Sequence, residues 1–306
     1  MALLLFEQIA SLFLCLCGGF LLVKLGLLRS SDSRILNTVC VYLIFPCVYI
    51  KAFQLPLTEG IWSGFLFALV VGALIQLVLI LVVRWIAKPL RLNSIDQASV
   101  IFSNAANLNF PLIAATLGEE WIIYGSAYVC VHTILYWTVC VSMIGGQSVR
   151  DWKKILLNPN IIFILIAILL MVSGLPIPNI LNTTINSVAA MIGPFSMMLI
   201  GVILGGIDLR SALRNRKVYL VAFLKLIAVP MLILLLMRLC RLSELIVNGD
   251  KIVYILFLAV IAPSGALVTQ ITQLYHQDAE YAGAINVVTT LLCIVTMPLM
   301  TWIYYL

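Results

Sequence analysis

The chain is dominated by apolar runs that are long enough to cross a lipid bilayer. A helix needs about 20 consecutive apolar residues to span the hydrocarbon core. Of the 306 residues, 63% are hydrophobic and only 10% are charged, which leaves too few polar side chains to coat a soluble globule. The sequence therefore predicts an all-α integral membrane protein. We place ten transmembrane helices near 3–28, 35–54, 60–86, 95–117, 120–144, 159–174, 180–207, 217–240, 251–275 and 279–305.

The positions of the basic residues predict how these spans are oriented. Cytoplasmic loops of membrane proteins are enriched in Lys and Arg. The loops after the odd-numbered spans contain thirteen such residues, and the loops on the other side contain four. We therefore predict a multi-pass protein of the plasma (inner) membrane with both termini extracytoplasmic. The net charge of +6 follows from this topology, so it does not indicate a nucleic-acid partner.

The second half of the sequence repeats features of the first at an offset of 157 residues. At this offset YGSAYVCVHTIL at 124–135 aligns with YAGAINVVTTLL at 281–292, with five of the twelve positions identical. Because a unit of five spans is odd, the two copies must cross the membrane in opposite senses, as in many secondary transporters. We predict a 5+5 inverted repeat, with the first copy at 1–144, a cytoplasmic linker at 145–158 and the second copy at 159–306.

Polar and helix-breaking residues interrupt the fourth and ninth spans at matching positions of the repeat. The fourth span contains SNAANLNFPL at 103–112, and the ninth contains IAPSGALVTQ at 261–270. An amide in hydrocarbon without a partner costs about 4 to 8 kcal/mol, and non-helical backbone is tolerated at this depth only where protein or a water-filled cavity surrounds it. We therefore expect the two segments to cross near the bilayer midplane, where paired breaks indicate a binding site.

We expect this crossing to bind a small anion. Asn104 and Asn107 are three residues apart and would share one helix face, and Pro111 suits the first turn of a new half-helix. The amino end of such a half-helix attracts an anion without a buried cation. The predicted substrate-binding residues are Asn104, Asn107, Asn109, Pro111, Pro263, Ser264, Thr269 and Gln270. No metal or other cofactor is predicted from these residues.

Two ionisable residues fall inside predicted spans. Lys225 lies about two turns into the eighth span, where an ionisable residue is a functional candidate. It would serve as a counter-charge for a carboxylate or in a salt-bridged gate, or its ammonium would reach the cytoplasmic headgroups. His132 is a candidate proton relay, or a hydrogen-bonded packing residue. No Asp or Glu lies near the predicted midplane, so a proton, sodium or no coupling ion all remain open.

Several short motifs follow one another in a defined order over nearly the whole chain. They are FLLVKLGLL at 20–28, LN at 36–37, Pro46, Asn104 with Pro111, NP at 158–159, GLPIP at 174–178, GPFSMMLIG at 193–201, APSG at 262–265, Asp278, Thr290 and Pro298. Each fragment alone is weak, but together they resemble the auxin efflux carrier family. This family includes bacterial malate-permease-like proteins and plant PIN carriers.

The resemblance implies a ten-helix fold like that of sodium/proton antiporters, with crossed broken helices 4 and 9 and elevator-type alternating access. It also implies transport of a small organic anion, a mono- or dicarboxylate similar to auxin or malate, often by a homodimer in the lipid bilayer. The family's crossover asparagine corresponds to Asn104 and its crossover prolines to Pro111 and Pro263. Two positions depart from the family pattern, Asn109 where Gly is common and Leu267 where a polar residue is frequent, and both would change which anion fits.

Other classes of function share parts of this pattern. An anion channel would have the same polar segments but would show neither saturation nor counterflow. A receptor or regulatory membrane module that retains the carrier fold would need a signalling domain or a partner. An enzyme is not predicted, because the sequence has no HExxH or GxSxG motif, no paired midplane aspartates and only two histidines, His132 and His276.

Overall fold

The chain forms an all-helical bundle. The computed structural model describes residues 2–54, 59–146, 156–206 and 215–306, with residues 2–10 described as backbone. Within these ranges every regular element is a helix, which confirms the predicted all-α class. Among the described residues, six stretches are long and apolar enough to span a membrane, as expected of a multi-pass membrane protein. They are Ser30–Ala52, Glu59–Ala87, Glu119–Gly145, Asn179–Gly205, Arg216–Leu239 and Ala279–Tyr304.

Most of these stretches combine two shorter helices. The helices are α1 (Ala2–Lys24), α2 (Ser33–Val39), α3 (Phe45–Ala52), α4 (Glu59–Ala87), α5 (Ser94–Ile101), α6 (Asn109–Thr116), α7 (Ile122–Leu135), α8 (Val141–Gly145), α10 (Pro159–Ser173), α11 (Asn179–Ala189), α12 (Ile192–Gly205), α14 (Arg216–Phe223), α15 (Val229–Leu239), α16 (Gly249–Ile261), α17 (Ala266–Leu274) and α18 (Ala279–Tyr304). A π-helical turn connects α2 to α3, α7 to α8 and α14 to α15. Pro46 and Pro230 follow two of these turns, and each lacks the amide that would bond four residues back.

The outward face of α4 shows how the bundle meets the membrane. Its exposed apolar side chains recur every three or four residues, so they form one stripe along the helix. They are Trp62, Leu66, Val70, Leu74, Leu77, Leu81 and Trp85. The opposite face is buried and contacts α7. Such a stripe is suited to contact with lipid.

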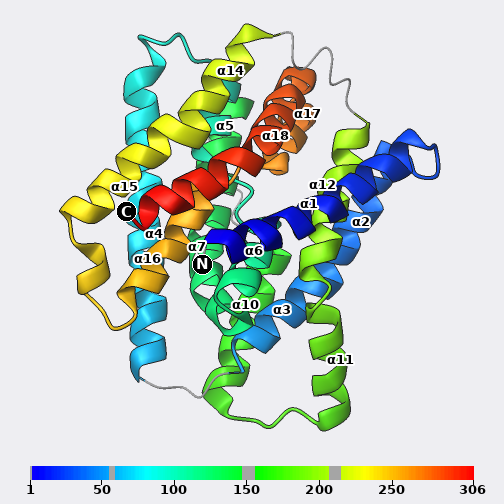
Figure 1. The fold of residues 1–306 in the computed structure, drawn as a ribbon, viewed down its shortest axis with the longest axis vertical. Helices are drawn as coiled ribbons and strands as arrows, with labels where there is room; N and C mark the ends of the chain where they lie inside the picture. The colour runs from blue at the N-terminus through cyan, green and yellow to red at the C-terminus, as the bar shows by residue number, and fades with distance from the viewer. Residues whose placement is uncertain (1, 55–58, 147–155, 207–214) are drawn as a thin grey trace.

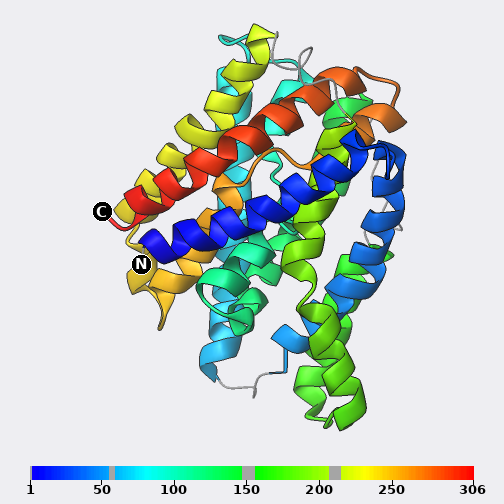
Figure 2. The same cartoon turned by 45° about the vertical axis from the view of Figure 1, so that its right-hand side comes forward.

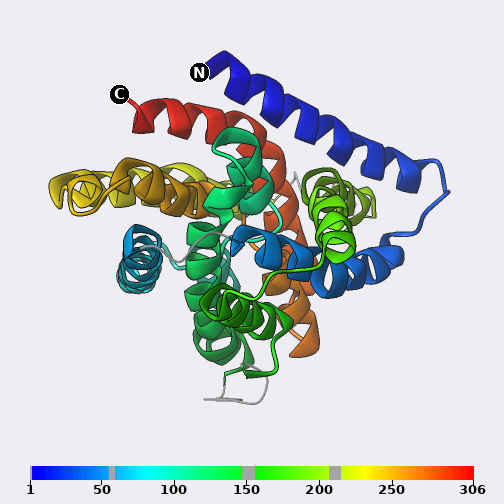
Figure 3. The same ribbon diagram turned by 90° about the horizontal axis from the view of Figure 1, so that it is seen from below.

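Helix α1 packs tightly against α12. Figure 1 shows α1 crossing the molecule obliquely, and Figure 2 shows it running beside α18, which it also contacts. A Cβ at Gly19 would overlap the carbonyl oxygen of Met198, and one at Gly201 would overlap that of Leu16. The glycines therefore allow the two helix backbones to touch, as small residues do between membrane helices. Seen from below, α1 lies at the edge of the molecule, with the two chain ends near each other (Figure 3).

Two helical segments are broken in the middle of the protein. No helix covers residues 102–108 between α5 and α6, or residues 262–265 between α16 and α17. Pro111 explains the first break, because its ring would clash with the carbonyl of Asn107 if the helix continued, whereas the first turn of α6 accepts it. Ala262 has an extended backbone, as expected for a residue before proline. The prediction that Asn104 and Asn107 share a helix face is therefore wrong.

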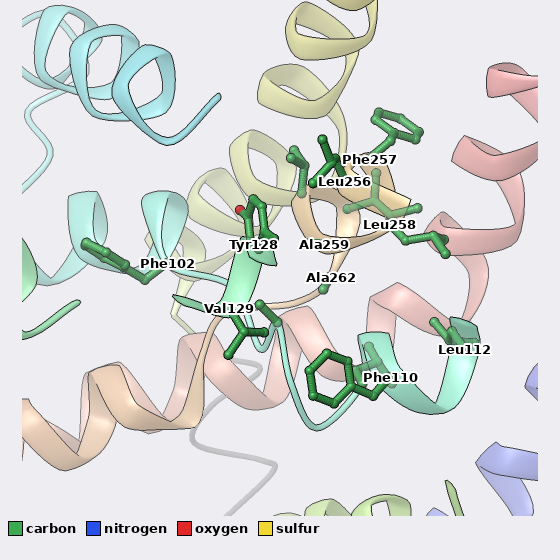
Figure 4. Close-up of a cluster of buried hydrophobic side chains, with 14 of the residues drawn as sticks. Phe102, Phe110, Leu112, Tyr128, Val129, Leu256, Phe257, Leu258, Ala259 and Ala262 are labelled. Carbon is green, nitrogen blue, oxygen red and sulfur yellow. The ribbon is translucent and has the colours of Figure 1, made fainter. Parts of the chain in front are cut away.

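The breaks lie inside the largest apolar cluster of the described chain. Nearly all of α16 is buried, from Ile252 to Ile261, so this helix runs through the centre of the protein. In Figure 4, Phe102 and Phe110 lie on either side of the first break and Ala262 lies at the start of the second. Their side chains are buried together with Tyr128 of α7. The non-helical backbone is thus enclosed by protein, where its polar groups need internal partners.

Candidate functional site

The two breaks contact each other through their main chains. The amide of Asn104 donates to the carbonyl oxygen of Pro263 over 2.8 Å, and the amide of Gly265 donates to that of Phe102 over 2.9 Å. A Cβ at Gly265 would lie 3.1 Å from the carbonyl oxygen of Ser103, so glycine permits this close approach. These hydrogen bonds satisfy backbone groups that neither helix can pair alone.

Helix α18 supports the second break from the side. The amide group of Asn286 donates to the carbonyl oxygen of Ser264 over 2.8 Å, and the hydroxyl of Thr289 accepts from the Ser264 amide over 3.2 Å. Both main-chain groups of Ser264 therefore have partners on α18. Neither Asn286 nor Thr289 is among the site residues predicted from the sequence. The sequence signal that could have identified Asn286 is its position as an asparagine within the apolar run 281–292.

Lys225 reaches the two breaks from the π-helical turn Leu224–Ala228. Its ammonium donates to the hydroxyl of Ser103 over 2.5 Å and lies 3.5 Å from the carbonyl oxygen of Val260. The side chain is only 2% exposed, so the alternative in which it reaches the headgroups is wrong. Among the residues that the structure describes, no carboxylate forms an ion pair with it.

His132 packs among aromatic rings beside the first break. Its ring lies 5.6 Å from that of Phe102, 5.9 Å from that of Tyr128 and 5.6 Å from that of Tyr136. The Nε2 atom is buried without a hydrogen-bond partner in the described chain. These contacts agree with packing, but the hydrogen bond expected of a packing histidine is not made by Nε2 in the described chain, and the role of proton relay stays a prediction.

Three predicted site residues carry buried polar atoms that have no hydrogen-bond partner in the part of the chain that the structure describes. The unpaired atoms are Nδ2 and Oδ1 of Asn109 and the hydroxyl oxygens of Ser264 and Thr269. Asn109 is completely buried. Leaving such a group unpaired costs about 1–3 kcal/mol, and native proteins contain few of them. These groups are therefore candidates for contact with a ligand.

Four other predicted residues are structural parts of the breaks. Asn104 and Pro263 form the main-chain pair described above, and both are buried. Pro111 is buried in the first turn of α6. Asn107 is half-buried, and its Oδ1 accepts a long hydrogen bond of 3.9 Å from the thiol of Cys40. That contact connects the first break to the π-helical turn Cys40–Ile44 between α2 and α3.

Gln270 lies outside the buried cluster, and its place in the substrate site stays a prediction. Helix α17 buries Val268 and Ile271, whereas Leu267 and Gln270 are exposed. At 3.6 residues per turn, Gln270 lies two positions from Val268 and so points away from the buried face. The sequence alone did not show which face of this short helix is buried.

At the amino ends of α6 and α17, some of the first backbone amides have hydrogen-bond partners and others do not. At the start of α6, Phe110 and Leu112 donate to carbonyl oxygens of the preceding turn, and Pro111 has no amide to donate. The first-turn amides without a partner in the described chain are those of Asn109, Ala266 and Leu267. Free amides at a helix amino end favour an anion.

A small apolar cavity lies beside the breaks, between α1, α6, α12 and α18. Its volume is 40 Å³, which is room for about one water molecule. Leu108 and Leu112, which flank the start of α6, form part of its wall together with Thr290 of α18. The rest of the wall is apolar: Leu12, Phe13, Leu16, Met197, Ile200, Cys293, Ile294 and Met297.

When the chain is compared with known proteins, one family model matches both of its halves. A family model described as a membrane transport protein matches residues 4–150 and again residues 147–301. No curated protein matches the chain. The two matches meet within the predicted linker at 145–158, of which residues 147–155 lie outside the described residues.

Proposed function

The chain belongs to the membrane transport protein family, that of auxin efflux carriers and PIN-like proteins, and from this we propose that it is a secondary transporter for a small organic anion. Its family is one of membrane transporters, so transport is the general function. The substrate that we propose is a mono- or dicarboxylate similar to auxin or malate. Elevator-type alternating access would carry it across the membrane.

We propose that the fold is the 5+5 inverted repeat, with copies at 1–144 and 159–306 joined by the linker at 145–158. The same family model matching both halves supports this proposal. So do the two breaks, which occur at related positions of the copies and contact each other. An even number of spans places both chain ends on one side, and the ends lie near each other in Figures 1 to 3. The bias of Lys and Arg supports an extracytoplasmic location for both.

The observation that carries the anion proposal is the set of unpaired polar atoms at the breaks. The Nδ2 atom of Asn109 and the hydroxyls of Ser264 and Thr269 are donors, and a carboxylate oxygen is a strong acceptor. The free amides of Ala266 and Leu267 add further donors at the start of α17. A ligand with negative charge would satisfy these groups better than a cation would.

We propose a carrier rather than a channel because two broken helices contact each other through their main chains. Paired broken helices are typical of transporters that work by alternating access. By family resemblance we propose a homodimer, which light scattering of the protein in detergent would test.

The test is uptake of labelled carboxylates into proteoliposomes by an Asn109→Leu variant. Replacing an unpaired buried amide by an apolar group of similar size is nearly neutral for folding. We therefore expect the melting temperature to be unchanged or higher, and uptake to fall by about tenfold or more.

The matched control is Thr116→Val, which removes a hydroxyl from the same helix. This hydroxyl donates to the carbonyl oxygen of Leu112 and makes no contact with the breaks, so uptake should be retained. Wild-type uptake by Asn109→Leu would count against the substrate site. Flux without saturation or counterflow in the unmodified protein would identify a channel instead.

A further inference from the structure

Two helix carboxyl ends meet inside the protein at the crossing. Helix α5 ends at Ile101 and helix α16 ends at Ile261. The last carbonyl groups of a helix have no partner within it, and each carboxyl end carries a partial charge of about −0.5. Two such ends therefore present about one negative charge in the centre of a membrane protein. A charge of this size, buried away from water, requires compensation.

The ammonium of Lys225 lies where these two ends meet. It contacts Ser103, two residues beyond the end of α5, and the carbonyl oxygen of Val260 in the last turn of α16. One positive charge thus faces both carboxyl ends. Lys51, Lys217 and Arg241 are the basic residues that pair with carboxylates in the described chain, and they lie elsewhere.

The opposite ends of the half-helices carry the opposite charge. Helices α6 and α17 begin after the breaks, and their amino ends keep the free amides of Asn109, Ala266 and Leu267. The crossing thus has one pair of ends that attracts a cation and another that attracts an anion. Among the residues that the structure describes, Lys225 is the charged side chain that contacts the first pair.

We propose that Lys225 is a built-in cation of the crossing, which neutralises the carboxyl ends of α5 and α16 so that transport needs no bound sodium or other soluble cation. This inference rests on the proposed anion transport, and it concerns coupling to sodium rather than coupling to a proton. Lys225 acts on the substrate through the crossing and is a positioning residue. Its contacts with Ser103 and Val260 engage the ammonium with protein groups rather than with the anion site.

The first test uses the unmodified protein. Uptake of a labelled carboxylate into proteoliposomes is measured in sodium, in potassium and in choline buffers at the same membrane potential. We expect the same rate in all three. A requirement for sodium would overturn the proposal, because a soluble cation would then neutralise the carboxyl ends of α5 and α16 in place of the lysine.

The second test removes the ammonium and returns it as a free molecule. Lys225→Ala leaves a space of the shape of the lysine side chain, and propylammonium has the size and charge to fill it. We expect the variant to lose uptake by about tenfold or more. Propylammonium should restore uptake and raise the melting temperature of Lys225→Ala.

The controls separate a cation effect from simple loss of folding. Lys225→Met fills the same space with an apolar chain, so it should lose uptake without rescue by propylammonium. Lys88→Ala removes an exposed lysine and should behave like the unmodified protein with and without the amine. Wild-type uptake by Lys225→Met, or no shift of Lys225→Ala by propylammonium, would overturn the proposal.

The two proposals fail in different ways. If the unmodified protein moves no carboxylate in any buffer, the transport proposal fails. The melting temperature of Lys225→Ala with propylammonium still reports on the cation position in that case. If Lys225→Ala does not fold, the sodium, potassium and choline comparison decides.

Discussion

Tyr281 donates a hydrogen bond of 2.7 Å to Oδ1 of Asp96 and so joins the amino end of α18 to that of α5. The other carboxylate oxygen pairs with the ammonium of Lys217 at 2.6 Å and accepts from the amide of Asn93 over 2.9 Å. Asp96 is completely buried. One carboxylate therefore ties together α5, α14 and α18.

The Asp96 cluster predicts unequal effects for its two side-chain partners. Lys217→Met leaves a buried carboxylate without its cation, which should lower the free energy of unfolding by about 3 kcal/mol. Tyr281→Phe removes one hydrogen bond to the carboxylate and should cost about 1.5 kcal/mol. Thermal and denaturant unfolding in detergent would measure both. If both variants lost the same free energy of unfolding, the lysine would not be the main partner that stabilises the buried carboxylate.

The contact between α1 and α12 predicts different outcomes for two adjacent glycines. Gly19→Ala places a methyl group against the backbone of α12 and should destabilise the protein by about 1–3 kcal/mol. Gly18 has nothing within 4 Å of its Cβ position. Gly18→Ala should therefore be neutral or slightly stabilising, because Ala favours a helix. Melting temperatures of the two variants would check this, and a similar loss in both would contradict the packing.

The support of the second break by α18 predicts that Asn286 is needed for both folding and transport. Asn286→Leu leaves the carbonyl oxygen of Ser264 unpaired, which should cost about 1–3 kcal/mol. Uptake should fall with it, since the start of α17 would lose its position. Asn186→Leu on α11 is the control, because its amide makes only a 3.5 Å contact with Asn182. Normal melting and uptake by Asn286→Leu would refute this role.

An ion pair between Lys51 and Glu119 joins the end of α3 to the turn after α6. Both side chains are about a third exposed (27% and 34%), so the pair should add less than about 1 kcal/mol to stability. If α6 moves relative to α3 during transport, Glu119→Gln should raise the uptake rate while changing the melting temperature little. The exchanged pair Lys51→Glu with Glu119→Lys should restore the original rate. An unchanged rate in Glu119→Gln would show that this contact persists during transport.

The position of the breaks could be predicted from the sequence because proline and clustered amides act locally. Pro111 and Pro263 limit where a helix can run, whatever surrounds them. The first break nevertheless begins at residue 102, earlier than the asparagines suggested, because Pro111 is accepted inside the first turn of α6 and the non-helical residues precede it.

The partners of the breaks could not be predicted in the same way. The contact of Lys225 with Ser103 spans 122 residues, and that of Tyr281 with Asp96 spans 185. Such contacts depend on how helices pack, and an apolar helix gives little sign of which face is buried. Gln270 illustrates this, because its polarity suggested a place in the site although its helix turns it outward.

The contact between the two breaks is made of backbone hydrogen bonds, from Asn104 to Pro263 and from Gly265 to Phe102. Main-chain bonds of this kind do not depend on the identity of most side chains that they carry. Mutation can therefore alter the chemistry of the neighbouring side chains while the architecture persists. A scaffold of this type is well suited to diversify into relatives that handle different solutes, and directed evolution of its selectivity should begin at Asn109 and Thr269 rather than at the residues that form the crossing.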